Sequence, residues 1–302
     1  MTGRHRVSIG IKTPPQDTDW ATVDAAWARI GEHEVFDSAW VNDHLTNARD
    51  PQGGASLEAL TTLAALAHHV PGRWLGIAVL SATFRHPAVL AKQLTVLDHV
   101  TGGRLIVGLG AGWHDPEHLP FGIPFPPIRE RFDRFESALG VIRALFSGEA
   151  RSLPGVIRPD PFYPLDGATN EPGSLTPGGP PIWLGGQRRR GFDLAARFAQ
   201  GWITPFLLPG GRNDRLPYFV EHRSKLLARM AELGRDPAGF EFALQVPTGA
   251  TASSRRDGLQ LALDGAKAGA TSIILSMPSE LGAEGVDLVA HELATPLREA
   301  LG

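Results

Sequence analysis

The chain of 302 residues contains no cysteine. A protein without cysteine forms no disulfide, has no thiolate nucleophile and cannot ligate an iron–sulfur cluster. Long apolar runs are missing too, since none approaches the roughly 20 residues that a membrane-spanning helix needs. The first ten residues, MTGRHRVSIG, also lack the apolar stretch of a signal peptide. A cytoplasmic location is the expectation that follows.

The sequence has no excess of positive charge either. Lys and Arg number 29 against 32 Asp and Glu, for a formal net charge of -3. Such a chain offers no general attraction to nucleic acid or to an anionic membrane. Apolar residues make up 42% of the chain and charged residues 20%, as in an ordinary globular enzyme. We therefore expect a small-molecule substrate and no polyanionic partner.

What the chain does contain is a complete strand, helix, strand unit between residues 73 and 113. Residues 74–80 form a nearly unbroken apolar run, which is typical of a strand buried on both faces of a parallel sheet. Pro87 suits the first turn of a helix, and the apolar residues after it fall on one stripe that ends at two glycines. A second apolar run at 105–109 then provides a parallel partner strand.

The same alternation continues along the chain, with eight predicted strands and roughly eight predicted helices. The expected strands cover residues 7–11, 35–41, 74–80, 105–109, 182–184, 202–203, 240–246 and 271–277. The expected helices cover residues 20–30, 56–69, 87–101, 127–146, 192–198, 214–233, 256–268 and 283–300, the second of them capped by Ser56. Because the alternation is regular and no linker divides it, it favours a closed (β/α)8 TIM barrel over an open doubly wound sheet. We predict one barrel domain over residues 1–302.

Residues 151–181 break this pattern, because proline and glycine crowd the segment. It is expected as an insertion between strands 4 and 5, a long loop with at most a short hairpin. Loops of this length inside compact domains are usually functional lids or disordered. We therefore predict a lid.

Polar residues follow the predicted strands where a barrel places its active site, at the C-terminal ends. Asp43 and His44 follow the second strand. This pair alone leaves two interpretations open, catalytic side chains or caps of the next loop. The glycines of GLGAG after the fourth strand do not match a dinucleotide fingerprint, because prolines stand where a phosphate-binding helix should begin.

The run HDPEH at 114–118 is a candidate metal site. It puts His114, Glu117 and His118 close together, and two histidines at i and i+4 can share a metal if they lie on one helical face. Pro116 places the run in a loop, so ordinary polar loop residues are favoured over a metal site.

Gly185 and Gly186, between a strand and a helix, let backbone N–H groups and a helix N-terminus meet an anion. The arginines at 188–190 add positive charge. A tight turn beside a solvated basic face is the alternative, and we favour a phosphate site. A side chain at Gly186 is expected to crowd the anion with little effect on apo-protein stability.

Several motifs recur in order over nearly the whole chain: FDSAWVNDHL at 36–45, FRHPAVLAKQLTVLDHVTGGRLIVGLGAGW at 84–113 and PPIWLGG at 180–186. Together they resemble the luciferase-like monooxygenase superfamily. The resemblance implies a TIM barrel that binds a flavin or deazaflavin at its C-terminal mouth, with the insertion partly folded over it. FDSAWVNDHL and HPAVLAKQ are most similar to the coenzyme F420-dependent branch, while FMN-dependent members share much of the pattern.

The resemblance also implies roles for individual residues. Asp43 and His44 would lie near the reactive ring, where His44 donates or accepts a proton. The remaining cofactor contacts implied are Ala78 and Val79, at a non-proline cis peptide behind the ring, Gly110, Ala111 and Gly112, at a close approach, and Gly185, Gly186 and Gln187, at a phosphate.

The function expected from this resemblance is an F420-dependent oxidoreductase that passes a hydride between the deazaflavin and a small organic substrate. The alternatives are a two-component monooxygenase that uses FMN, oxygen and a separate reductase, and a barrel that carries the cofactor without catalysis. A homodimer is a further expectation. Trp113 stands where similar F420-dependent glucose-6-phosphate dehydrogenases place a catalytic Glu, which argues against a sugar-phosphate substrate.

Overall fold

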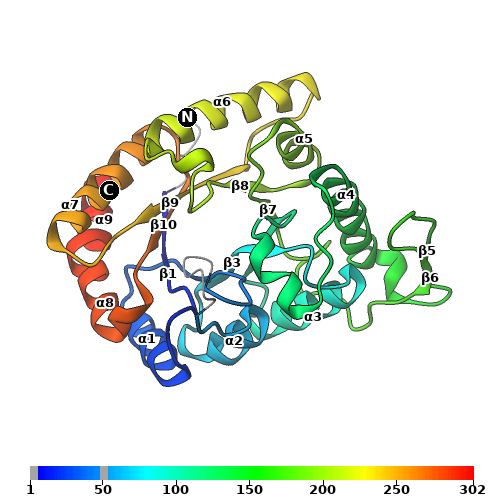
Figure 1. Ribbon diagram of the computed structural model, residues 1–302, viewed down its shortest axis with the longest axis horizontal. Helices are drawn as coiled ribbons and strands as arrows, with labels where there is room; N and C mark the ends of the chain where they lie inside the picture. Colours follow the sequence, from blue (N-terminus) through cyan, green and yellow to red (C-terminus); the bar gives the residue numbers. More distant parts are fainter. Residues whose placement is uncertain (1–5, 48–53) are drawn as a thin grey trace.

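Eight parallel strands close into a barrel, which confirms the predicted (β/α)8 architecture (Figure 1). The computed structural model describes residues 6–47 and 54–302. Around the barrel the strands follow the order β1, β2, β3, β4, β7, β8, β9 and β10, and β10 pairs with β1. Their bounds are β1 Ser8–Lys12, β2 Ser38–Val41, β3 Trp74–Ser81, β4 Leu105–Gly110, β7 Ile182–Leu184, β8 Gly201–Ile203, β9 Glu241–Pro247 and β10 Ser272–Ser276.

Helices surround the barrel and cover its outer face (Figure 1). In α1, for example, the buried residues recur at helical spacing, and the Asp19 side chain caps the first turn by accepting from the N–H of Thr22. The α-helices are α1 Trp20–Glu32, α2 Ala59–Leu66, α3 Pro87–Val100, α4 Ile128–Leu145, α5 Arg189–Phe198, α6 Arg215–Glu232, α7 Ala252–Lys267, α8 Gly282–Val289 and α9 Thr295–Leu301. Among the described residues, no helix combines the length and the apolar character needed to cross a membrane.

The inside of the barrel is filled by a compact apolar cluster around Trp40. Gly10 and Gly76 make room for this ring, since a β-carbon at Gly76 would lie 2.2 Å from it. The indole N–H of Trp40 donates to Ser38 at 2.8 Å, and the ring of Trp183 lies 5.6 Å away. Because side chains fill the interior, a ligand must bind at an end of the barrel.

Two predicted helices differ from the structure in their cap or their continuity, and the helices predicted from 192 and 256 begin earlier, at Arg189 and Ala252. The second begins at Ala59, and Glu58, not Ser56, caps it, because the Glu58 carboxylate accepts from the N–H groups of Leu60 and Thr61. Ser56 instead donates its hydroxyl to the carbonyl of His44. The predicted helix at 283–300 is divided into α8, a π-helical turn η7 (Ala290–Ala294) and α9. Pro296, in the first turn of α9, has no N–H to continue the regular bonding.

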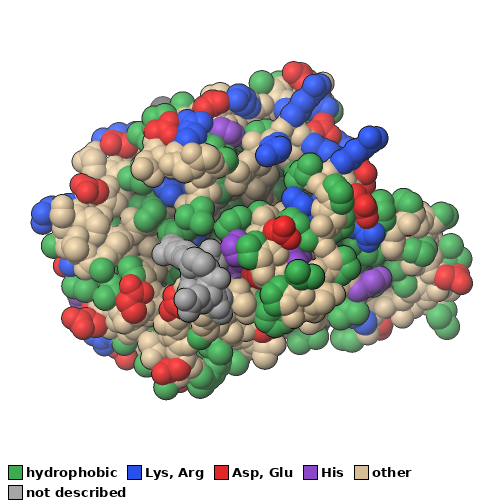
Figure 2. Space-filling view, viewed as in Figure 1, with side chains coloured by type: hydrophobic (Ala, Val, Ile, Leu, Met, Phe, Trp, Pro, Cys, Tyr) green, Lys and Arg blue, Asp and Glu red, His purple; other side chains and the backbone are tan. Residues whose placement is uncertain are grey.

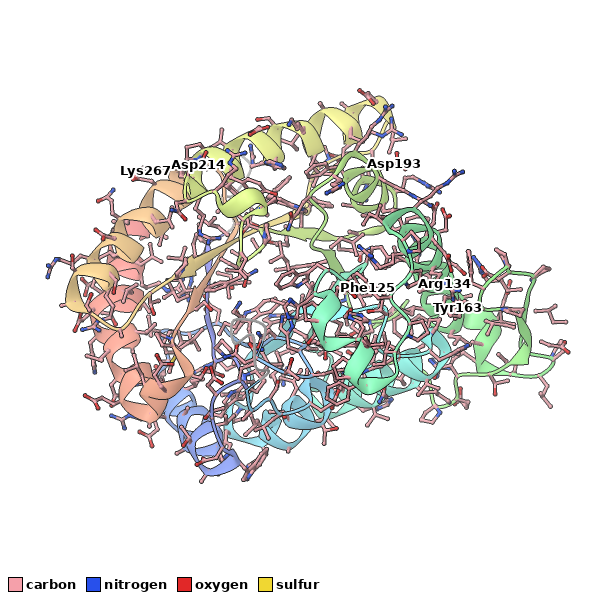
Figure 3. All side chains as sticks on the ribbon, in the orientation of Figure 1. Phe125, Arg134, Tyr163, Asp193, Asp214 and Lys267 are labelled. Atoms are coloured by element: carbon pink, nitrogen blue, oxygen red, sulfur yellow. The ribbon has the colours of Figure 1, made fainter. Side chains whose placement is uncertain are left out.

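Residues 151–181 contain a two-stranded antiparallel hairpin of β5 (Val156–Arg158) and β6 (Leu165–Ala168). The segment packs against the outside of α3 and α4: Asn170 donates to Thr95 at 2.9 Å, and the guanidinium of Arg134 lies 5.0 Å from the ring of Phe162. Figure 3 shows Arg134 beside Tyr163 at this contact. None of residues 151–181 lines the mouth of the barrel. The predicted lid is therefore an insertion on the outer surface in this structure, while the single-domain organisation stays a prediction.

Candidate active site at the mouth of the barrel

A cavity of about 850 Å³ opens at the C-terminal ends of the barrel strands. All eight strands contribute to its wall at or next to their last residues: Lys12, Asn42, Ser81, Gly110, Gly185, Ile203, Pro247 and Ser276. Cavities of roughly 300 to 1,000 Å³ bind ligands of drug or cofactor size. The cavity therefore has the place and the size expected of an active site in this fold.

The structure brings all the residues predicted for the site into this one cavity. The wall includes Asp43, His44, Ala78, Val79, Gly110, Ala111, Gly112, Gly185, Gly186 and Gln187. The peptide bond between Ala78 and Val79 is cis, as the resemblance implied. The roles assigned to the individual residues stay predictions.

His44 is held by Glu117, a residue of the HDPEH run that the sequence did not link to His44. Nδ1 of His44 lies 3.0 Å from Oε1 of Glu117, and the N–H of Leu45 donates to Oε2 at 2.9 Å. Burial alone would raise the pKa of Glu117, but the hydrogen bonds from His44 and Leu45 and the nearby imidazole of His114 lower it overall. Glu117 is thus a buried carboxylate that faces the His44 ring.

His118, the last residue of the HDPEH run, does not contact His44 or Glu117 through its hydrogen bonds. His118 contacts the carbonyl of His114 through Nδ1 at 2.8 Å and the hydroxyl of Thr83 through Nε2 at 2.7 Å. Thr83 in turn contacts Ser81, at the end of β3. The run therefore fixes the loop after β4 against β3.

Asp43 is buried in an ion pair that the sequence did not indicate. Arg85 donates to both of its carboxylate oxygens, at 2.7 and 2.8 Å, and the N–H of Ser81 donates to one of them at 3.0 Å. Arg85 also pairs with Glu58, the cap of α2. Asp43 therefore ties the end of β2 to the end of β3, which positions the neighbouring His44.

Lys12 is a further wall residue that the sequence did not single out. The side chain is buried, its Nζ bonds to Oε1 of Gln245, and it lies 4.4 Å from the ring centre of Phe206. Gln245 donates to the carbonyl of Thr204 at 2.6 Å. A lysine at the end of the first apolar strand was the signal in the sequence, because lysine is rarely buried without a partner.

The turn after β7 has the close packing that its glycines suggested. A β-carbon at Gly186 would lie 2.8 Å from backbone atoms of Gly191 in α5. This contact argues against the expectation that a side chain at Gly186 would leave apo-protein stability little changed, because the added atom meets backbone. At Gly185 a β-carbon would meet only the Val79 side chain, at 3.4 Å.

Positive charge lies beside this turn. Lys and Arg side chains gather over α5 and the adjoining end of α6 (Figure 2). Of the predicted basic run, Arg188 lines the cavity together with Arg131 of α4, while Arg190 pairs with Asp133. Burial lowers the pKa of Arg131, and the charge of Arg188 lowers it further against the opposing effect of Asp115. An anion here would neutralise both arginines.

Comparison with known proteins identifies the family. Residues 11–263 match the family described as luciferase-like monooxygenase. The chain belongs to this family. The motifs of the sequence predict the same family, and that prediction is confirmed.

Curated and structural relatives of this luciferase-like protein share parts of its sequence or its fold. An F420-dependent glucose-6-phosphate dehydrogenase of Beutenbergia cavernae is 34% identical over 195 residues, which cover 61% of this chain and 55% of that protein. The phthiodiolone/phenolphthiodiolone dimycocerosates ketoreductase of Mycobacterium tuberculosis H37Rv is 29% identical over 280 residues, 86% of this chain and 67% of that protein. The chain thus spans about half the length of the first of these relatives.

A solved F420-dependent secondary alcohol dehydrogenase, in complex with an F420-acetone adduct, has the same fold. It superposes with a TM-score of 0.76, at 17% identity, over 97% of this chain and 99% of that chain.

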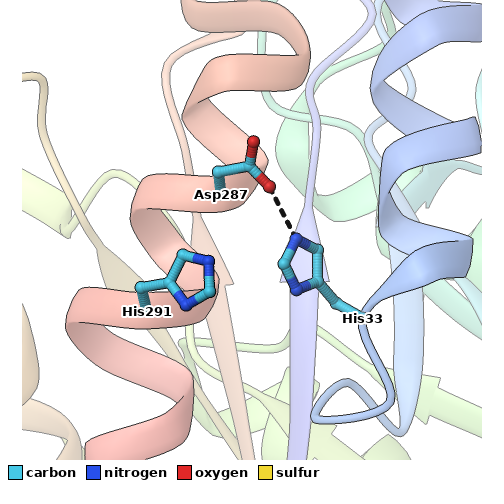
Figure 4. A group of neighbouring side chains, drawn as sticks. All are labelled: His33, Asp287 and His291. Atoms are coloured by element: carbon cyan, nitrogen blue, oxygen red, sulfur yellow. Dashed lines mark hydrogen bonds and ion pairs between the residues drawn. The ribbon is translucent and has the colours of Figure 1, made fainter.

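Another group of titratable side chains in this luciferase-like protein lies outside the cavity. His33 follows α1, and Asp287 and His291 belong to α8 and η7 (Figure 4). One possible ligand atom from each lies within 4.8 Å of the others. Oδ1 of Asp287 already accepts from Arg29 at 2.6 Å, however, and lies 2.7 Å from Nε2 of His33. Because the Arg29 charge opposes a cation at that oxygen, the group acts as a link between α1 and α8.

Proposed function

We propose that this protein is an oxidoreductase that binds coenzyme F420 in the mouth cavity and passes a hydride between the deazaflavin and a small organic substrate. The observation that carries the proposal is that His44, held by Glu117, lines the same cavity as Val79 and the turn at Gly185. Relatives named as F420-dependent enzymes support the cofactor. A relative named as a ketoreductase favours a carbonyl or alcohol substrate.

The residues around the cavity suit an anionic cofactor. Nε of Arg131 is buried and has no hydrogen-bond partner among the described residues, although Nη1 donates to the carbonyl of Pro126. A phosphate oxygen is an acceptor for such a donor, and a charge-assisted bond is stronger than a neutral one. The turn at Gly185 leaves space that a side chain would fill. We therefore assign the phosphate to the region between Gly185, Gln187 and Arg131.

With F420 bound in this way, the residues that line the mouth cavity have distinct roles. When bound, the deazaflavin supplies or takes up the hydride. Ala78 and Val79 support the ring from behind, and the N–H groups around Gly186 and Gln187 bind the phosphate. His44 supplies or removes the proton that accompanies the hydride, because imidazole can do either near pH 7. Trp113, 57% exposed at the mouth, offers an apolar surface to the organic part of the substrate.

Cofactor binding is tested by fluorescence titration of the purified protein with F420 and, in parallel, with FMN. Saturable binding of F420, tighter than that of FMN, is the expected result. Tight binding of FMN without binding of F420, together with oxygen consumption in the presence of reduced FMN, would replace the proposal with the monooxygenase alternative.

Turnover is tested with reduced F420 and a panel of ketones, and in reverse with secondary alcohols. His44→Gln is expected to keep the fold and the affinity for F420 while kcat falls about 10²- to 10⁴-fold, the usual range for general acid–base catalysis. The matched control is His68→Gln, the same change at an exposed histidine of the 3-10 turn Ala67–His69. Binding without turnover of any substrate in wild type would support a carrier. Normal turnover by His44→Gln would remove His44 from the mechanism.

A further inference from the structure

Glu117 contacts one particular nitrogen of the His44 ring, Nδ1. Both carboxylate oxygens of Glu117 face Nδ1 of His44, at 3.0 and 3.2 Å. The N–H of Leu45, the next residue, donates to the same carboxylate, so the loop after β2 is fixed in two places. Among the described residues, Nε2 of His44 has no hydrogen-bond partner.

We propose that Glu117 is the positioning residue of this site: it holds the proton on Nδ1 of His44, and so makes Nε2 the atom that exchanges a proton with the substrate. The proposal rests on the proposed function for its chemistry. The structural half of the proposal is the position of the proton on the His44 ring, and it can be tested in the protein without cofactor.

The tautomer of His44 follows from what a carboxylate can do. An ionised carboxylate only accepts hydrogen bonds, so Nδ1 of His44 must be the donor in this contact. Glu117 is ionised at neutral pH because the hydrogen bonds from His44 and Leu45 outweigh the effect of burial on its pKa. The neutral imidazole therefore has its proton on Nδ1 and a lone pair on Nε2.

The proton balance follows from this tautomer. When a ketone is reduced, the carbonyl carbon receives the hydride from the reduced deazaflavin and the C=O double bond becomes a single bond. The oxygen takes the proton from Nε2 of the His44 imidazolium, which leaves a neutral ring that keeps its Nδ1 proton and donates it in the hydrogen bond to Glu117. In alcohol oxidation the neutral Nε2 accepts the hydroxyl proton, and the negative charge of Glu117 stabilises the imidazolium formed.

Among the described residues, only Glu117 forms a hydrogen bond with the His44 ring, so Glu117 sets the orientation of the ring. The rings of Trp113 and His114 pack edge-on against His44, with centres 5.8 and 6.1 Å away. Burial lowers the pKa of His114, against the opposing charge of Glu117. Asp115, on the same turn as Glu117, is exposed and makes no side-chain hydrogen bond to any residue that the structure describes. Glu117 is thus the carboxylate of this turn that contacts the ring.

The tautomer can be read directly in the apo-protein. Long-range 1H–15N correlation spectra of protein labelled at histidine distinguish a proton on Nδ1 from one on Nε2, and the signal missing from His44→Gln identifies His44. A proton on Nδ1 in wild type and a mixture of tautomers in Glu117→Gln are expected. A proton on Nε2 in wild type would overturn the proposal. This spectrum needs no folded Glu117 variant and no cofactor, so its outcome is independent of the proposed function.

A double-mutant cycle tests the role in turnover. Glu117→Gln is expected to lower kcat about 10²-fold, while KM and the dissociation constant of F420 change less than about threefold. In a His44→Gln background the same change should have almost no further effect on kcat, because Glu117 acts through His44. The matched control is Asp115→Asn, which removes a carboxylate from the same turn and should leave kcat near the wild-type value.

Two outcomes contradict this role. Equal losses from Glu117→Gln in both backgrounds would mean that Glu117 acts independently of His44, as a merely structural residue would. An unchanged kcat in the single variant would mean that the charge of Glu117 is not used. If F420 does not bind at all but the tautomer is as expected, the proposed function fails and the structural half of this inference stands.

Discussion

A pair of alanine substitutions in the turn after β7 separates packing from cofactor binding. The β-carbon of Gly186→Ala would lie 2.8 Å from Cα and the carbonyl carbon of Gly191. The β-carbon of Gly185→Ala would lie 3.4 and 3.5 Å from the two methyl groups of Val79, an ordinary contact on the cavity wall. The two variants differ by one position, yet we expect a large loss of stability from Gly186→Ala only, so that a loss of affinity in Gly185→Ala reports on the cofactor and not on packing.

The magnitudes follow from these distances. Overpacking against a well-packed interior costs about 1 to 3 kcal/mol, and Gly186→Ala should fall in the upper part of that range because backbone of α5 cannot rotate away. Gly185 has no left-handed backbone conformation, so Gly185→Ala should change the free energy of unfolding by less than about 1 kcal/mol. Its methyl group would occupy cavity space beside Val79, and F420 affinity should fall about tenfold, roughly 1.4 kcal/mol.

Urea denaturation of the apo-proteins and fluorescence titration with F420 measure both effects on the same samples. A Gly186→Ala protein as stable as wild type would refute the packing argument. If Gly185→Ala binds F420 with unchanged affinity, the cofactor does not approach this turn, and the phosphate must be assigned elsewhere in the cavity.

Two other predictions concern buried polar groups. Asp43→Asn should lower the free energy of unfolding by about 2 to 3 kcal/mol. This is slightly less than the usual loss for a broken buried ion pair, because Arg85 keeps Glu58 as a partner. Urea denaturation at pH 7 checks this, and an unchanged midpoint would mean that the ion pair contributes nothing to stability. Tyr218 has a buried hydroxyl without a partner among the described residues, and burial raises its pKa to about 12. Because the unfolded tyrosine ionises near pH 10, wild type should lose stability between pH 10 and 12. Tyr218→Phe should lack this loss, and at pH 7 it should be equally stable or up to about 1 kcal/mol more stable than wild type. A variant less stable than wild type would show that the hydroxyl has a partner.

The barrel itself was predictable from local patterns. Strands that are buried on both faces are continuous apolar runs, and the helices that cover them have one apolar stripe, so the strand-and-helix order can be read without knowing any contact. The boundaries were less accurate where side chains compete for a cap. Glu58 begins α2 because its carboxylate reaches two N–H groups, whereas Ser56 has the carbonyl of His44 as its partner.

The residues of the site were predictable for a related reason. Asp43, His44 and the glycines after β4 and β7 follow the ends of strands, and a closed parallel barrel places all strand ends of one kind at one mouth. The positions along the sequence therefore implied that these residues share a cavity. The sequence did not indicate that the insertion at 151–181 would pack on α3 and α4, because a segment without periodicity does not specify which surface it covers.

The sequence by itself thus determined the order of elements, the family motifs and part of the set of residues at the mouth. Only the tertiary structure decided their partners: Glu117 faces His44 across 73 positions, and Arg85 faces Asp43 across 42. The physical reason is that hydrophobic periodicity is local, whereas a buried charge is paired through space. Which carboxylate faces which ring depends on the stagger of the strands and the course of the loop after β4, and both are set only when the barrel closes.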